Sequence, residues 1–224
     1  MDLLFTPAKL GTCELKNRIV RSATNGHLSD EKGQVTPLWA DTLIELAKNE
    51  VGLVITGHFC VDKMQRADAG QPVLDETTDE SLLRRACDGV HRYGGKLFFQ
   101  LSHSGIKGVE SVNGAPPKHP EDFTREELDR LVEQFAFAAK KCKESGADCV
   151  QVSGIDFNRR AGQKTPFYLD ALICEPDFAA KLKSGAQDGS KCLACNGCYT
   201  IYRKRFVRCV QHQDEIEQFK TIPW

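Results

Sequence analysis

The sequence lacks an excess of charge of either sign. Its 224 residues carry 30 Lys and Arg side chains against 31 Asp and Glu side chains, which gives a formal net charge of −1. A protein that binds nucleic acid through its phosphates needs a concentration of positive charge, and no basic arm is present. The charge balance therefore predicts no nucleic-acid partner.

Long apolar runs are also missing. No stretch approaches the ~20 apolar residues that cross a bilayer as a helix. The opening residues MDLLFTPAKLG do not place a basic segment before an apolar one, as a secretory signal does. Repeats and low-complexity tracts are absent too, and 41% of the residues are hydrophobic, an ordinary fraction for a folded domain. The sequence predicts a folded, cytoplasmic protein with no membrane partner.

Cysteine is abundant, with ten residues. Six stand singly in apolar segments, and we expect small buried core residues there, because free cysteine is among the most buried types. These six are Cys13, Cys60, Cys87, Cys142, Cys149 and Cys174. The other four cluster near the C-terminus, and they are Cys192, Cys195, Cys198 and Cys209. Without a secretory signal we expect no disulfide framework, which leaves metal or redox chemistry, or a reduced cysteine-rich turn.

Strands and helices alternate in the first two-thirds of the chain. Short apolar runs predict strands at residues 17–22, 51–56, 96–101 and 148–153. Helical periodicity predicts helices at residues 37–49, 79–93 and 125–145, with a further helical run at 176–183. Four strands separated by helices predict a parallel sheet with right-handed crossovers.

The helix at 125–145 has the clearest signals. Thr124 and Glu127 have the spacing of a capping box. An apolar stripe follows, which we expect to face the core, and it consists of Leu128, Leu131, Val132, Phe135 and Ala139. After residue 153 the alternation stops.

The segment LFTPAKLGTCELKNRIVRSAT at residues 4–24 resembles the opening of the old yellow enzyme family, the FMN-dependent ene-reductases and their 2,4-dienoyl-CoA reductase relatives. Further segments agree in the expected order, and they are GLVITG (52–57), FFQLSHSG (98–105), residues 121–152, residues 172–185 and KCLACNGC (191–198). The resemblance implies an α/β fold of the (β/α)8 TIM-barrel family. FMN would then lie across the C-terminal ends of the strands.

The same resemblance implies a set of cofactor-binding residues. Ser22, Ala23 and Thr24 would touch the isoalloxazine ring at the end of the first strand. Gly57 would let the ring approach the backbone, and Gln100 would hydrogen-bond the pyrimidine edge of the flavin, since a carboxamide both donates and accepts. Each has a local alternative: the hydroxyl residues as loop caps, Gly57 as a turn glycine, and Gln100 as a partner for loop backbone.

The sequence also departs from the family. The fourth predicted strand, VQVSG, lacks the His pair that binds the substrate carbonyl, and the strands that cradle the FMN phosphate are not legible. We therefore expect an incomplete barrel with about four to five strands and weak or no FMN retention. The chain could be a splice or gene-model product, a degenerate relative, or a half-barrel that pairs with a second copy.

The resemblance extends to the cysteine cluster. Its C-x2-C-x2-C spacing is similar to the loop that holds a [4Fe–4S] cluster in dienoyl-CoA reductase-like members, with Cys209 as a fourth ligand. Four thiolates also suit zinc. A reduced turn without metal remains open.

Together these observations predict a partial FMN-type barrel over residues 1–185 and a cysteine-containing segment over residues 186–224. The implied function is an FMN-dependent NAD(P)H oxidoreductase acting on an activated alkene or enone, with activity reduced or lost through truncation. The alternatives are a catalytically silent interaction subunit, paired as a homo-oligomer or with a full-length paralogue, and a cysteine-rich metal or electron-transfer module.

Overall fold

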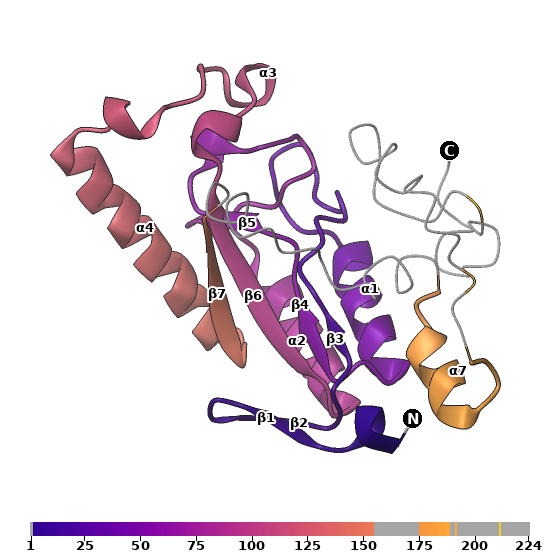
Figure 1. Cartoon of the computed structure of the whole chain (residues 1–224). Helices are drawn as coiled ribbons and strands as arrows, with labels where there is room; N and C mark the ends of the chain where they lie inside the picture. The colour runs from indigo at the N-terminus through magenta and orange to yellow at the C-terminus, as the bar shows by residue number, and fades with distance from the viewer. Residues whose placement is uncertain (1, 155–174, 189–190, 192–210, 212–224) are drawn as a thin grey trace.

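A parallel sheet forms the centre of the fold. The computed structural model describes residues 2–154, 175–188, 191 and 211 (Figure 1). The sheet contains β3 (Val20–Arg21), β4 (Leu53–Ile55), β5 (Phe59–Cys60), β6 (Lys96–His103) and β7 (Cys149–Gly154). In it β3 pairs with β4, β4 and β5 both pair with β6, and β6 pairs with β7, all in parallel. The predicted parallel sheet is confirmed.

Three helices cover one face of this sheet, and they are α1 (Pro37–Lys48), α2 (Glu80–Arg92) and α4 (Arg125–Glu144). The helix α7 (Phe178–Ser184) adds Phe178 and Ala179 to the same core. Short helical segments connect these elements: η1 (Asp2–Phe5), η2 (Lys63–Gln65), η3 (Gly105–Lys107), α3 (Glu110–Asn113) and η4 (Pro120–Asp122). Within the described residues, no helix has both the length and the apolar character to cross a membrane.

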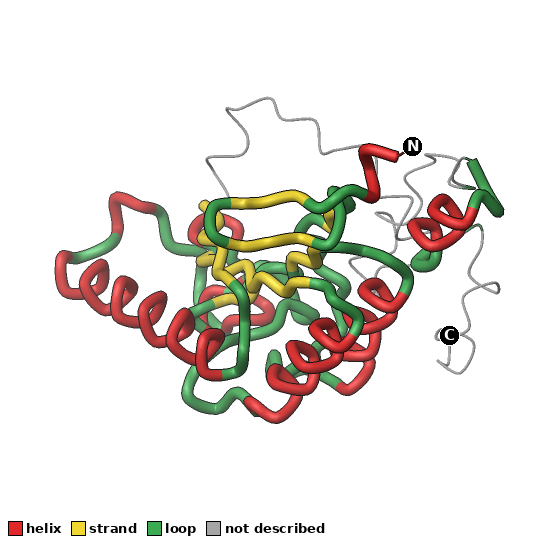
Figure 2. The backbone as a smooth tube through the Cα atoms, turned by 90° about the horizontal axis from the view of Figure 1, so that it is seen from below, coloured by secondary structure: helices red, strands yellow, loops and turns green. Residues whose placement is uncertain are grey.

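A hairpin that the sequence analysis did not predict closes one end of the sheet. Its strands β1 (Ala8–Leu10) and β2 (Cys13–Leu15) are antiparallel and turn at Gly11, whose φ of +59° favours glycine. Figure 2 shows the hairpin across the end of the sheet. Leu15 packs against Leu53 and Phe98 there. Each of its strands has only three residues, too few for a period-two pattern to be visible.

The helices begin where their capping residues predict. Thr36 accepts a hydrogen bond from the backbone N–H of Trp39, and Asp79 accepts one from that of Ser81. Thr124 and Glu127 make both hydrogen bonds of a capping box at the start of α4. These caps satisfy N–H groups that a helix start leaves without intrahelical partners.

The two faces of the sheet bury different residues. Leu97, Phe99 and Leu101 of β6 belong to the large core between the sheet and the helices. Phe98 faces the other way and packs with Leu53 and Leu15. Since side chains alternate along a strand, Gln100 and Ser102 lie on the same face as Phe98. We call this the inner face.

The strand beside β6 is interrupted between β4 and β5. Ile55 pairs with Phe98 and Phe59 pairs with Leu101, so four residue steps on one strand match three on the other. One extra residue is therefore inserted in the segment 56–58, as in a β-bulge. An extra residue reverses the alternation, so Ile55 packs on the inner face and Phe59 in the helix-side core.

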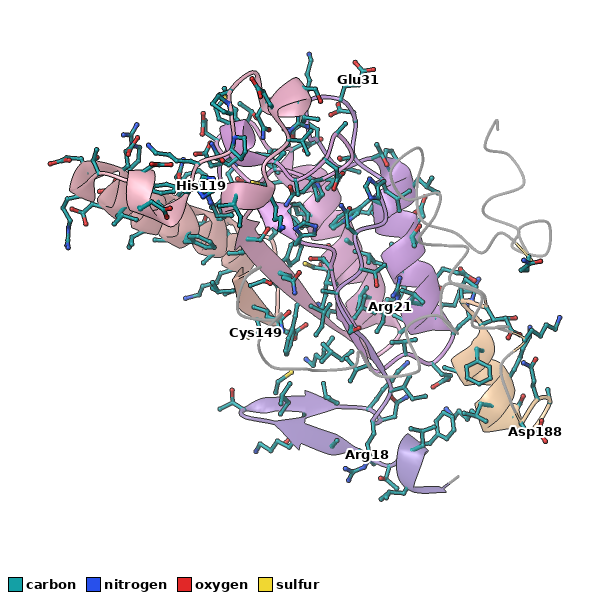
Figure 3. All side chains as sticks on the ribbon, turned by 45° about the horizontal axis from the view of Figure 1, so that its top comes forward. Arg18, Arg21, Glu31, His119, Cys149 and Asp188 are labelled. Atoms are coloured by element: carbon teal, nitrogen blue, oxygen red, sulfur yellow. The ribbon has the colours of Figure 1, made fainter. Side chains whose placement is uncertain are left out.

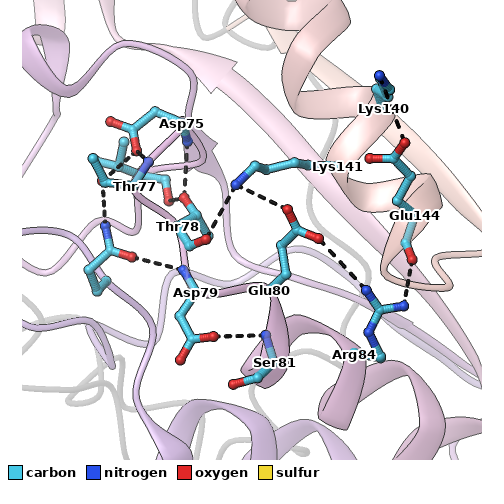
Figure 4. Close-up of polar contacts among 12 residues, drawn as sticks. Asp75, Thr77, Thr78, Asp79, Glu80, Ser81, Arg84, Lys140, Lys141 and Glu144 are labelled. Atoms are coloured by element: carbon cyan, nitrogen blue, oxygen red, sulfur yellow. Dashed lines mark hydrogen bonds and ion pairs between the residues drawn. The ribbon is translucent and has the colours of Figure 1, made fainter.

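Helix α4 is anchored at its C-terminal half. The buried Lys141 ammonium lies 3.2 Å from a carboxylate oxygen of Glu80 and donates to the carbonyl of Thr78 at 3.3 Å. Arg84 donates to the Glu144 carbonyl at 2.8 Å. Figure 4 shows these contacts joining the start of α2 to the end of α4.

The N-terminal half of α4 is largely uncovered. Leu131, Phe135 and Ala139 pack against the core as expected, but Leu128 and Val132 are exposed. The predicted apolar stripe is therefore wrong at these two positions. They lie on the flank of the helix beyond which the described part of the sheet ends at β7.

The scattered cysteines are also partly buried and partly exposed. Cys60, Cys87 and Cys142 are buried, as predicted, and burial raises the pKa of each thiol to about 12. Cys13 is half-buried and Cys149 is exposed, so the prediction of core positions is wrong there. Figure 3 places Cys149 at the end of β7 that faces the β1–β2 hairpin. Cys174 lies outside the described residues.

Candidate cofactor site at the strand ends

The C-terminal ends of β3 and β4 come into close contact at Gly57. A Cβ atom on this residue would lie 2.6 Å from the Thr24 carbonyl oxygen and 2.8 Å from the Asn25 Cα. Those atoms belong to backbone and cannot swing aside. Gly57 is therefore the residue type that lets the two strand ends meet. The close approach in the described chain is to the backbone after β3, and an approach of a flavin ring to Gly57 stays a prediction.

The end of β6 joins this junction through Thr56. The Thr56 hydroxyl accepts a hydrogen bond from the backbone N–H of Gln100 at 3.1 Å, and the Thr56 N–H donates to the Phe98 carbonyl at 2.9 Å. On the inner face, the Gln100 carboxamide donates to Gln151 of β7 at 2.8 Å. The described structure thus brings Gly57 and Thr24 beside the part of β6 that contains Gln100, three residues before this strand ends at His103.

The turn after β3 holds the other two predicted residues. Ser22 and Ala23 are half-buried and follow β3 directly. The Thr24 hydroxyl donates to the Ser22 carbonyl at 3.3 Å and accepts from the Arg21 guanidinium. The Thr24 hydroxyl therefore has local partners, and only its backbone contacts the neighbouring strand.

A buried histidine beside this turn was not anticipated. His27 lies in the loop after β3, its side chain is only 7% exposed, and its Nδ1 lies 2.9 Å from a carboxylate oxygen of Asp68. Asn25 donates to the other Asp68 oxygen at 2.9 Å. Asp68 is distant in sequence, so no local pattern could have revealed the contact.

Two further histidines lie at the strand ends. His58 is half-buried beside Gly57, and burial lowers its pKa. His103 ends β6, its Nδ1 accepts from the Gly105 N–H at 3.1 Å, and its ring packs edge-on against Phe123. Burial lowers the pKa of His103 as well. Burial therefore favours the neutral form of both rings.

A small cavity lies on the opposite side of the junction, between the sheet and α1. Thr24 and Gly57 line it together with Trp39, Leu43 and Leu46 of α1, and its volume is about 60 Å³. Ligand pockets typically measure roughly 300–1,000 Å³. This cavity is too small for a flavin.

The described residues fit one end of FMN. The half-buried turn 22–24 follows β3, the Gln100 carboxamide lies on the inner face of β6, and Gln100 can both donate and accept toward a heterocycle edge. The phosphate end needs backbone amides or cationic groups on later strands. Within the described ranges the sheet ends at β7, so no phosphate-binding strand is seen there.

The predicted metal ligands cannot be placed. Cys192, Cys195, Cys198 and Cys209 all lie outside the described residues. Among the residues that are described, no three His, Cys, Asp or Glu side chains are grouped so that they could hold a metal ion. The metal hypothesis stays a prediction.

The described sheet and helices constitute part of a (β/α)8 barrel. The model of the NADH:flavin oxidoreductase / NADH oxidase family matches residues 3–156, well over half of the chain. The chain therefore belongs to this family, and the predicted kinship with old yellow enzymes is confirmed.

Curated relatives of similar sequence are consistent with this family assignment. The chain is 34% identical over 169 residues to a metal reductase of Desulforamulus reducens, covering 68% of this chain and 24% of that protein. It is 30% identical over 162 residues to an NADPH dehydrogenase of Bacillus licheniformis, covering 67% of this chain and 48% of that protein. The chain thus spans between about a quarter and about half of these relatives' length.

Solved structures show the same fold. An old yellow enzyme homologue from Zymomonas mobilis matches with a TM-score of 0.60 at 22% identity, over 66% of this chain and 47% of that one. A 2-naphthoyl-CoA reductase matches with a TM-score of 0.64 at 22% identity, over 84% of this chain and 34% of that one. The old yellow enzymes are (β/α)8 barrels, of which this chain forms only part.

Proposed function

We propose that the chain derives from, and retains the flavin-ring site of, an FMN-dependent NAD(P)H oxidoreductase that reduces activated alkenes or enones. The observation that carries the proposal is the junction at which Thr24 and Gly57, just after β3 and β4, meet β6 near Gln100, three residues before that strand ends. Family membership and a relative named NADPH dehydrogenase support it.

In this proposal each residue has a distinct task. Gln100 hydrogen-bonds the polar edge of the ring and is itself oriented by Gln151. Ser22, Ala23 and Thr24 contact the ring from the turn after β3, and Gly57 keeps that turn against β4. Bound FMN would supply the hydride chemistry, while the protein supplies position and electrostatics.

We also propose that this chain alone holds FMN weakly. The support is the sequence, in which the strands that cradle the FMN phosphate in the family are not legible. A dianionic phosphate without charge-assisted hydrogen bonds contributes little to affinity.

Titration of the purified chain with FMN tests the proposal. We expect a perturbed flavin absorption spectrum that saturates only at high FMN concentration, and NADPH consumption that depends on cyclohex-2-enone. Gln100→Ala should weaken FMN binding by roughly tenfold through the loss of a hydrogen-bonding side chain. Gln134→Ala on α4 is the matched control and should bind as the parent does.

Two results would count against this function. The first is a flavin spectrum that stays unperturbed at every FMN concentration. The second is a stoichiometric flavin retained through purification, which contradicts weak binding.

A second candidate, an interaction subunit, is favoured by the edge of β7, which pairs only with β6 among the described strands. Val152 on this strand is 67% exposed, and Val132 on the adjoining helix is 68% exposed. An uncovered strand edge beside apolar side chains is a pairing surface. Sedimentation velocity over a range of concentrations tests this, alone and with a full-length paralogue. A strictly monomeric chain that binds no paralogue would exclude it.

The cysteine cluster supports a third candidate only through its spacing. We propose that any metal it binds is [4Fe–4S] or zinc, as the spacing allows. Iron and zinc analysis of anaerobically purified protein decides this. If the protein contains neither iron nor zinc, the remaining interpretation is a reduced cysteine-rich turn.

A further inference from the structure

The interruption between β4 and β5 changes the direction of one side chain. Without the extra residue, alternation from Val54 would place residue 58 on the helix side of the sheet. With it, the Nδ1 of His58 lies 3.1 Å from the Ser102 hydroxyl, on the inner face. Bulges commonly redirect a side chain beside a functional site.

A buried glutamine fixes this imidazole. The fully buried Gln71 accepts the Ala67 N–H at 2.6 Å through its Oε1. Because a backbone N–H can only donate, this contact identifies the oxygen end of the carboxamide. The Gln71 Nε2 then donates to the His58 Nδ1 at 2.8 Å and to the Ser102 hydroxyl at 3.2 Å.

The arrangement determines which ring nitrogen carries the proton. An Nδ1 that accepts a hydrogen bond is deprotonated, so the neutral ring is protonated at Nε2. Burial lowers the pKa of His58, with Asp68 opposing this effect and His27 adding to it. Within the described part of the chain, the His58 Nε2 has no hydrogen-bond partner. It is also not among the side-chain atoms that are fully buried without a partner.

We propose that the Nε2–H of His58 is a ligand-binding donor that, beside Gln100, binds a carbonyl or imide oxygen on an uncharged part of the ligand. Ser102, which His58 contacts, lies two residues beyond Gln100 on one face of β6, about 7 Å along the strand. The pair therefore suits a planar ligand lying across the strand ends.

The ligand class follows from the charge state of the donor. A neutral N–H gives an anionic oxygen no ion-pair energy, so it favours carbonyl oxygens over carboxylates. The flavin pyrimidine edge and an enone both present such oxygens. This inference deepens the proposed function and rests on it for the choice of these ligands, but the hydrogen-bond network around His58 stands independently.

Nitrogen-15 NMR of the histidines in the full chain tests the proposal. We expect His58 to be protonated at Nε2, and its Nε2–H resonance to shift on addition of FMN or of cyclohex-2-enone. A shift with FMN alone identifies the flavin edge, and a shift with the enone alone identifies the substrate. His58→Ala should weaken binding of that ligand by about two- to tenfold, and His58→Gln, which keeps a donor, should restore part of it.

The exposed His119 provides the matched control. His119→Ala should leave ligand affinity unchanged. Gln71→Glu offers a second test of which ring nitrogen carries the proton. A carboxylate at this position would accept a hydrogen bond from His58 and so move the proton to Nδ1. If this variant fails to fold, the parent spectra and His58→Ala still decide the outcome.

The outcomes separate the two proposals. If FMN binds but His58 is protonated at Nδ1, or neither ligand moves its resonance, the role of His58 is overturned while the flavin function stands. If FMN leaves the spectrum and His58 unchanged but the enone shifts His58, the flavin function fails and the role of His58 stands. If nothing binds, both fail.

Discussion

Strands β6 and β7 are hydrogen-bonded neighbours with similar sequences and opposite surroundings. Leu101 and Val152 are register partners on the same face, yet Leu101 is fully buried and Val152 is 67% exposed. On the inner face, Phe98 is buried and its partner Cys149 is exposed. An apolar residue on a strand is therefore buried only where both flanks of the strand are covered.

The two strands are consequently held in place by different forces. β6 is stabilised by apolar packing, with Leu97, Phe99 and Leu101 all fully buried. β7 depends more on polar contacts at its start, where Asp148 binds Lys96 at 2.9 Å and His91 at 2.7 Å and accepts from the Leu97 N–H at 2.9 Å. Substitutions in the two strands should separate these contributions.

The largest effect is expected from removing a β6 core residue. Phe99→Ala should lower the free energy of unfolding by about 3–5 kcal/mol, because a fully buried aromatic ring leaves a cavity. Val152→Ala on β7 should lower it by less than about 0.5 kcal/mol. Urea denaturation of both variants measures the difference. Equal losses would show that β7 is covered on its outer side in solution.

An intermediate effect is expected at the anchor of β7. Burial would raise the pKa of Asp148, but hydrogen bonds from Lys96, His91 and the Leu97 N–H outweigh it and hold the pKa below its usual range. Asp148→Asn should cost about 2 kcal/mol at neutral pH. Chemical denaturation across a pH series measures this.

The sign of the pH dependence follows from that lowered pKa. The stabilisation by Asp148 is complete above its unfolded pKa of about 4 and disappears as the pH falls through the lower folded value. The gap between parent and Asp148→Asn should therefore close in acid. Asp129→Asn, at an exposed pair with Arg125, is the control and should change stability little. A gap that persists below the folded pKa would contradict this account.

The smallest effect is expected at the capping box of α4. Thr124→Ala removes the side chain that accepts the Glu127 N–H and should cost about 1 kcal/mol. Because the nearby Leu128 and Val132 are exposed, we expect much of the loss as local fraying. Hydrogen exchange should show faster exchange in the first turns of α4 than around Cys142. Uniform acceleration along the helix would instead mean that both halves unfold together.

The sequence predicted the features that local chemistry encodes. The capping box at Thr124, the three long helices and the parallel pairing all agree with the structure. The family resemblance places Thr24 and Gly57 just after strands, which agrees with the structure, but it places Gln100 at a strand end, whereas Gln100 lies inside β6.

Other features depended on distant partners. The burial of His27 depends on Asp68. The His58 side chain points to the inner face because one extra residue lies between the pairings of β4 and β5 with β6. A strand as short as β5, with two residues, has no alternation from which this could be predicted. The exposure of Leu128 and Val132 depends on what flanks α4, which helical periodicity cannot report. Periodicity identifies an apolar side of an element but not whether another element covers it.

The order of pairing has a consequence for biosynthesis. β7 leaves the ribosome after β6, with α3 and the 20-residue α4 between them, and translation proceeds at about 5–20 residues per second. For an interval on the order of seconds, β6 is thus the outermost strand of the nascent sheet. Its unpaired backbone groups could then pair with a neighbouring nascent chain, so yield should depend on the spacing of ribosomes along the message.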